Sequence, residues 1–227
     1  MTAALFDLRP VAEEIVTEDD APLDNLFQEK CQRLLTRPLY ASWRGGHRGR
    51  RFLAAANVGV FASPDRQPIV PDAFLSLDVE VPPDWRVKAN RSYLIWRFGK
   101  PPEVAIEIVS NSGGNETSVK PAIYARMGFR YYAVFDPLGR LGAEPLRVFR
   151  LGGEWEEPYP HRQLDGIGLG LSLWEGTFEG LDATFLRWCD EDGAIIPTGE
   201  ERADQERARS DRLAAQLRAA GIEPDGG

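Results

Sequence analysis

Three residues of this sequence have the types and the spacing that metal-assisted chemistry on a phosphate requires. Asp72 begins a predicted strand, Glu107 lies in the middle of a long apolar run, and Lys120 lies in the first turns of a predicted helix. Two carboxylates on adjacent strands can hold a hard divalent cation such as Mg²⁺ or Mn²⁺, and the backbone carbonyl of Ile108 could complete the shell. Such a metal polarises a scissile phosphate and activates water, while a nearby ammonium group offsets the developing charge.

Each of these residues also has an ordinary structural interpretation. Asp72 could be a turn aspartate, and Glu107 could form a structural ion pair with an arginine. Lys120 could pair with Glu116 four residues earlier on a helix surface. Residue types and spacing alone therefore leave both interpretations open.

The segment that must position Glu107 and Lys120 runs from Pro101 to Pro137 and is predicted to form strand, turn, helix and strand. Residues 103–109 are apolar at almost every position, as expected for a strand covered on both faces. A buried, unpaired carboxylate is costly, so Glu107 needs a metal, a cation or a water-filled cleft. The helix over 117–127 has an apolar face at four-residue spacing, and Gly128 is typical of a C-terminal cap.

The rest of the chain is predicted to add β structure and two further helices. A helix capped by Asp24 is expected to run to about Leu35 and to end at Pro38. Residues 51–61 and 69–81 are predicted strands, 93–97 a short extended segment, and 146–151 a half-buried antiparallel strand. A β-rich segment covers 169–188. Residues 200–219 are charged and helix-prone with a thin apolar stripe, which predicts a protruding helix or weak coiled coil.

Composition indicates one substantial domain with an appendage in a chain of 227 residues. There is no run of about 18 apolar residues and no pattern of a signal peptide, so the protein is expected to be cytoplasmic, without a membrane partner. Cys31 and Cys189 are expected to be reduced thiols. Two histidines give a histidine metal site little support, and Ser110 and Ser112 lack the glycine pattern of a nucleophile.

Charge is unevenly distributed along the chain. The formal net charge of −8 argues against a simple nucleic-acid binder. However, residues 30–51 and 86–100 each carry several lysines and arginines and no acidic residue. These runs are either solvated loop and helix surfaces or surfaces that face phosphates.

Four stretches of this sequence resemble the signature of the Uma-two family. They are Pro71-Asp72, the run from Pro102 to Ser110 around Glu107, the run from Glu116 through Lys120 and Tyr124 to Gly128, and Tyr131 to Pro137. That family is assigned to the restriction endonucleases of the PD-(D/E)XK nuclease superfamily, and the resemblance covers about residues 22–190. It implies that Asp72 and Glu107 are metal carboxylates and that Lys120 is the catalytic lysine.

The sequence departs from these patterns at two positions. In the superfamily the lysine lies two residues after the second acid, and this chain has Val109 there, so Lys120 must reach the site from the helix. The family usually carries an aspartate four residues before that lysine, where this chain has Glu116.

The resulting prediction is an α/β fold with a restriction-endonuclease-like mixed β-sheet, flanking helices and a charged C-terminal helix. We expect an N-terminal arm over 1–21, a nuclease domain over 22–196 and a helical tail over 197–227. The first hypothesis is a Mg²⁺-dependent DNA endonuclease with its cleft beside residues 30–51, working as a homodimer. The alternative is a catalytically degenerate nuclease fold that dimerises and binds protein or nucleic acid. A carboxylate-pair glycosidase ranks last, because Lys120 has no role in it.

Overall fold

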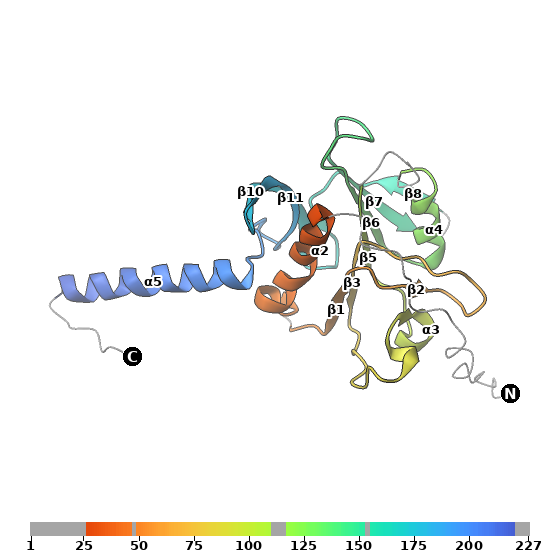
Figure 1. The fold of residues 1–227 in the computed structure, drawn as a ribbon, viewed down its shortest axis with the longest axis horizontal. Coiled ribbons are helices and arrows are strands. Elements are labelled where there is room, and N and C mark those ends of the chain that lie inside the picture. The colour runs from red at the N-terminus through yellow and green to blue at the C-terminus, as the bar shows by residue number, and fades with distance from the viewer. Residues whose placement is uncertain (1–25, 47–48, 110–116, 153–154, 221–227) are drawn as a thin grey trace.

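The computed structural model describes residues 26–46, 49–109, 117–152 and 155–220. Within these ranges, six strands form one mixed sheet in the order β1-β3-β5-β6-β7-β8 (Figure 1). β5 and β6 are parallel, and every other neighbouring pair in this sheet is antiparallel. The strands are β1 (Phe52–Ala55), β3 (Ala73–Leu77), β5 (Val104–Ile108), β6 (Tyr131–Phe135), β7 (Leu146–Gly152) and β8 (Trp155–Pro158).

Smaller sheets and short helices complete the described part of the fold. β9 (Gln163–Leu164), β10 (Leu169–Phe178) and β11 (Leu181–Cys189) form an antiparallel sheet. β2 (Val60–Phe61) pairs with β4 (Tyr93–Leu94) in parallel. The short helices are η3 (Lys88–Asn90) and α3 (Ile95–Phe98), so the extended segment predicted over 93–97 is strand only at its first two residues.

The longer helices lie on the two faces of the large sheet. α2 (Leu26–Pro38) packs with β10 and β11 on one face, and α4 (Lys120–Met127) lies on the other beside β7 and β8 (Figure 1). The helix was predicted to end at Pro38. The α-helical part does end there, but the chain continues as the π-helical segment η1 (Leu39–Trp43). Proline cannot donate the α-helical hydrogen bond, and here it marks the change to the wider π turn. Asp24, the predicted cap, lies outside the described residues.

Side chains of β5 alternate between two cores. Val104, Ile106 and Ile108 belong to the core shared with α2, while Ala105 and Val109 belong to the core beneath α4. This alternation is the two-residue period of a strand covered on both faces. Glu107 has the parity of Ala105 and Val109, so its side chain is directed to the face that α4 covers.

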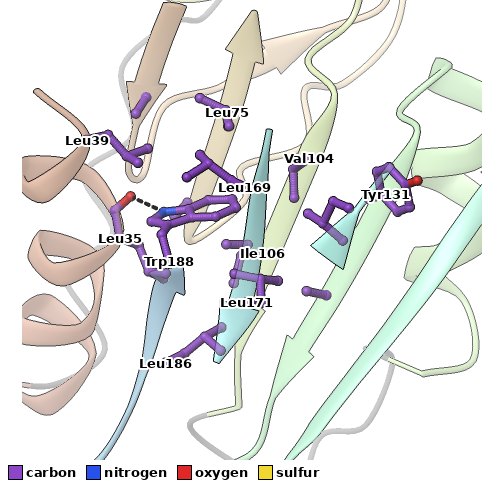
Figure 2. Close-up of a cluster of buried hydrophobic side chains, with 14 of the residues drawn as sticks. Leu35, Leu39, Leu75, Val104, Ile106, Tyr131, Leu169, Leu171, Leu186 and Trp188 are labelled. Carbon is purple, nitrogen blue, oxygen red and sulfur yellow. Dashed lines mark hydrogen bonds between the residues drawn. The ribbon is translucent and has the colours of Figure 1, made fainter. Parts of the chain in front are cut away.

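Figure 2 shows the core on the α2 face. The Trp188 indole on β11 packs among leucines and isoleucines, and its Nε1–H donates to the carbonyl of Leu35 over 2.7 Å. This bond satisfies the one polar group of a fully buried ring. It fixes the β10–β11 hairpin against α2.

Two predicted strands are shorter than expected. The strand predicted over 51–61 is broken between β1 and β2, where Asn57 has a φ of 53°. The strand predicted over 69–81 forms a ladder only over β3, apart from an isolated bridge between Ile69 and Val60, and Asp78 after β3 has a φ of 57°. Residues in the left-handed region cannot continue a strand, and their positions are not visible in the apolar pattern.

The last helix, α5 (Gly199–Ala219), projects from the body of the molecule (Figure 1). None of its side chains is buried. A capping box between Thr198 and Glu201 starts it, and Glu201 also accepts two hydrogen bonds from Arg187, which is 2% exposed. The base of the helix is therefore tied to β11, as a charged helix needs when it has no apolar packing.

Two predictions about the whole composition can be compared with the described residues. Cys31 and Cys189 are free and buried, and burial raises the pKa of the Cys31 thiol to about 12. In the described part of the chain, no helix combines the length and the apolar character needed to cross a membrane.

Candidate active site

Strand register brings the two predicted carboxylates together. β3 and β5 are antiparallel with Ala73 opposite Ile106. The same register carried one residue further sets Asp72 beside Glu107, at the cross-strand spacing of about 5 Å between Cα atoms. Asp72 has its own bond to β5, because the Ile108 N–H donates to Asp72 Oδ2 over 2.7 Å.

Glu107 has a cation and a phenol as its partners. The residue is 4% exposed, and Lys120 Nζ lies 2.9 Å from its Oε2. The Tyr124 hydroxyl donates to its Oε1 over 2.6 Å. Both partners come from α4, one turn apart, which is the spacing at which side chains share a helix face. α4 therefore supplies both groups that compensate the buried carboxylate.

Burial dominates the acid–base properties of this pair. The pKa of Glu107 is raised to about 7. Removal from water is the largest cause, the Lys120 charge opposes the rise, and the Asp72 charge adds to it. Burial and the neighbouring Glu107 hold the pKa of Tyr124 well above its usual value, so its hydroxyl keeps its proton. A carboxyl group that titrates near neutrality in such a setting is typical of functional sites.

Asp72 is held by α2 as well as by β5. Its Oδ1 accepts hydrogen bonds from the side-chain amides of Gln28 at 2.5 Å and Gln32 at 3.2 Å. Burial raises the pKa of Asp72, and the bonds from Ile108, Gln28 and Gln32 oppose that rise. These three donors fix the orientation of the carboxylate.

Lys120 reaches the site from the start of α4, where the resemblance predicted it. Its side chain is 29% exposed, so the ammonium group lies between the buried carboxylate and solvent. Val109, which occupies the superfamily position of the lysine, is 2% exposed in the core beneath α4. A lysine at that position would be buried among apolar side chains. The other expected partner of Lys120, Glu116, lies outside the described residues.

The donor set at Asp72 and Glu107 fits a small, hard cation. Each carboxylate oxygen has two lone pairs, and Asp72 Oδ2, Glu107 Oε1 and Glu107 Oε2 each accept one protein hydrogen bond. In the described ranges no group of three or more histidine, cysteine, aspartate or glutamate side chains is placed to hold a metal. Mg²⁺ is commonly bound through one or two carboxylates with water completing its shell, so two carboxylates suffice. The carbonyl of Ile108 as a further ligand stays a prediction.

Basic residues of the segment 30–51 are largely paired with acids from distant parts of the chain. Lys30 and Arg33 both contact Glu179 in the β10–β11 turn. Arg50 pairs with Asp78 and Arg51 with Glu80. Residues 30–51 contain no acidic residue, but acidic residues from other parts of the chain lie beside them in the fold. Much of the positive charge of this segment is therefore compensated.

Sequence reasoning missed the role of Gln28 and Gln32 and the polar role of Tyr124. The two glutamines lie four residues apart and are 3% and 5% exposed, among the apolar residues of α2. Amides at helical spacing on an apolar face were the available signal, since buried polar groups need partners. Tyr124 was expected only to contribute to the apolar face of its helix.

Comparison with known proteins identifies the family. No curated protein and no solved structure gave a match to this chain. A family model with the description "Uma2: Putative restriction endonuclease" matches residues 12–178. The mixed sheet with flanking helices and a C-terminal helix agrees with the predicted restriction-endonuclease-like fold. Because the match covers most of the chain, including Asp72, Glu107 and Lys120, the protein belongs to the Uma2 family of restriction-endonuclease-like proteins.

Proposed function

We propose that this protein is a metal-dependent endonuclease that hydrolyses phosphodiester bonds in DNA. The observation that carries the proposal is the buried Glu107 carboxylate, with Lys120 Nζ 2.9 Å away and Asp72 directly before the adjacent strand β3. Membership of the family supports a nuclease-like function. DNA as the substrate and Mg²⁺ or Mn²⁺ as the cofactor are the finer parts of the proposal.

Asp72 and Glu107 are the residues that would hold the metal. A divalent ion bound there supplies Lewis-acid polarisation of the phosphate and a water of lowered pKa. Lys120 would donate to a water or to a phosphate oxygen, where its charge would offset the negative charge that develops during hydrolysis. Tyr124 and the glutamine pair of α2 keep the two carboxylates oriented, which preserves the geometry between turnovers.

Lys120 has two states in this account. Without substrate it compensates Glu107, whose burial makes an unpaired charge costly. A cation between the carboxylates would take over that compensation and release the ammonium group toward the phosphate. Partial exposure of the lysine is consistent with this exchange.

Nicking of supercoiled plasmid by the purified protein tests the proposal. We expect nicking that requires Mg²⁺ or Mn²⁺ and falls on the order of a hundredfold or more in Glu107→Gln and in Lys120→Gln, because each removes electrostatic stabilisation of the transition state. Arg66→Gln, which removes an exposed arginine, is the control and should nick like the wild type. Nicking that persists without metal, or in both site variants, would contradict the proposed site.

The alternative function, a dimerising binding module, has its own supporting observation. α5 extends for 21 residues with no buried side chain, although its base is fixed by Arg187 and Glu201. A long helix without packing gains little stability by itself, so a partner helix is expected. We propose that α5 of a second copy of this chain is that partner, and this dimer is compatible with either function.

A further inference from the structure

A pocket of about 530 Å³ is lined in part by residues that hydrogen-bond to Asp72. Its walls come from α2, the end of β5, the turn after β6 and β11. Two of its lining residues, Gln28 and Ile108, are the donors that hold the two oxygens of the Asp72 carboxylate. The pocket therefore borders the Asp72 side of the candidate active site, and its volume is in the range of small-ligand pockets.

The wall of this pocket is mainly apolar. Phe27, Val109, Pro137, Leu138 and Ala183 contribute to it. The Phe27 ring is fixed by stacking on Phe185, with centroids 5.5 Å apart and an interplanar angle of 23°. Leu138 is 67% exposed, an unusual amount for a leucine that lines a pocket. In the described part of the structure no side chain shields most of this leucine from water. Contact with a flat, apolar group would remove that apolar surface from water, which is favourable.

An arginine without an acidic partner stands at the same turn. Arg140 lines the pocket and is exposed, and no carboxylate of the described residues lies within ion-pairing distance of its guanidinium. This differs from Lys30 and Arg33, which are both neutralised by Glu179. The charge of Arg140 is thus available to an anion outside the protein, and a phosphate suits the guanidinium fork.

The turn that carries these two residues is held from inside. Asp136 is 1% exposed, and its carboxylate accepts the backbone N–H groups of Arg140 at 3.0 Å and Leu141 at 2.6 Å. These bonds use only the main chain of Arg140, so they leave its side chain, which has no ion-pair partner among the described residues, and that of Leu138 uninvolved. The family-like Asp136-Pro137 pair therefore presents one apolar and one cationic side chain at a fixed place in the wall of the pocket.

We propose that this pocket receives the base of an unpaired nucleotide, with the adjoining phosphate on Arg140. The substrate would then be DNA with an unpaired nucleotide next to the scissile bond, rather than uninterrupted duplex. A paired base cannot leave the stack without cost, whereas an unpaired base already exposes its faces and gains by entering an apolar pocket. The inference rests on the proposed function, because the position beside Asp72 is what makes a nucleotide the expected occupant.

Fluorescence anisotropy with three labelled DNAs of equal length tests the inference. One carries a single unpaired nucleotide, the second an abasic residue at that bulge, and the third is fully paired. Ca²⁺ replaces Mg²⁺ so that no strand is cut. We expect the bulged DNA to bind roughly tenfold more tightly than the abasic one, because the two differ only in the base that stacks and leaves water.

Two variants separate the base from the phosphate. Leu138→Ala should bring the affinity ratio of bulged to abasic DNA close to one. Arg140→Gln should weaken both equally and reduce the slope of log affinity against log salt by about one phosphate contact. Val81→Ala and Arg66→Gln, exposed residues away from the pocket lining, are the matched controls and should leave ratio and slope unchanged.

Equal binding of bulged and abasic DNA by the wild type would overturn the inference, as would a ratio that Leu138→Ala leaves intact. Plasmid nicking gives an independent outcome. Nicking without a preference for the unpaired base would leave the nuclease proposal standing and remove only this one. A base preference without nicking would remove the nuclease proposal and leave a nucleotide-binding pocket.

Discussion

Glu107 is both a buried residue of the central sheet and a proposed metal ligand. The side chain stands on a strand whose neighbours are all core residues, and its partners Lys120 and Tyr124 come from one face of one helix. A structural ion pair could have been made by any nearby basic residue. The additional carboxylate of Asp72, held by three hydrogen bonds, is what a purely structural pair would not need.

The raised pKa of Glu107 predicts a specific pH dependence of stability in the metal-free protein. Folded Glu107 keeps its proton up to pH of about 7, while the unfolded chain loses it near 4.5. The folded state binds the extra proton between these values, so the free energy of unfolding falls as pH rises through this window. In Glu107→Gln this dependence disappears, and the melting temperature in EDTA should fall less between pH 4.5 and about 7 than in the wild type.

Glu157→Gln is the matched control, because it also removes a glutamate but from an exposed pair with Arg150. Its melting curve should follow the wild-type pH dependence. Parallel curves for Glu107→Gln and the wild type would show that Glu107 has no raised pKa.

Among the elements, α4 holds Glu107 and α2 holds Asp72. α4 brings the ammonium group and the phenol to Glu107, and α2 brings two amides to Asp72. A lysine on β5 itself is not needed to contact Glu107, because Lys120 in the first turn of α4 contacts that carboxylate. Val109 is thereby free to pack in the core.

α5 is the element whose role lies outside the site. Its residues 199–207 hold four acids and two arginines, while residues 208–219 hold three arginines and one acid. An antiparallel pair of such helices sets the acidic half of each copy against the basic half of the other, and a parallel pair does not. Ala203, Ser210 and Leu217 repeat at seven residues with Leu213 between them, which gives a narrow seam for this contact.

Light scattering should therefore give a mass near twice that of the 25.3 kDa chain. Leu213→Glu combined with Leu217→Glu places charges in the seam and should yield monomers. Ala208→Glu combined with Ala215→Glu adds the same charges on the opposite side of the helix and should remain dimeric. Monomers for the wild type, or dissociation of both double variants, would exclude the antiparallel seam.

At the scale of the whole molecule, the segment from β5 to β6 was the most predictable part. Local signals suffice there, because the apolar strand, the four-residue helical spacing and Gly128 with a φ of 87° agree with one another. Residue type and spacing singled out Lys120 on the predicted helix, and the resemblance added its assignment as the catalytic lysine. The relation of Asp72 to Glu107 depends on the β3–β5 register, which is set by packing of both strands.

Contacts between distant segments could not be predicted from the sequence. Glu179 neutralises Lys30 and Arg33 only because the β10–β11 hairpin packs on α2, so the basic run looked more available than it is. The glutamines of α2 likewise contact Asp72 only because distant segments of the chain pack together. The break at Asn57 depends on one backbone angle that several residue types can adopt. These features need the tertiary arrangement before they can be seen.

The central claim is that Asp72 and Glu107 form one metal-binding pair beside Lys120, and calorimetric titration with Mn²⁺ tests it most directly. It needs neither the right DNA nor catalysis. We expect one Mn²⁺ bound per chain in the wild type, loss of that binding in Asp72→Asn and in Glu107→Gln, and retained binding in Lys120→Gln. Binding that is unchanged in both carboxylate variants, or absent from the folded wild type, would contradict the account.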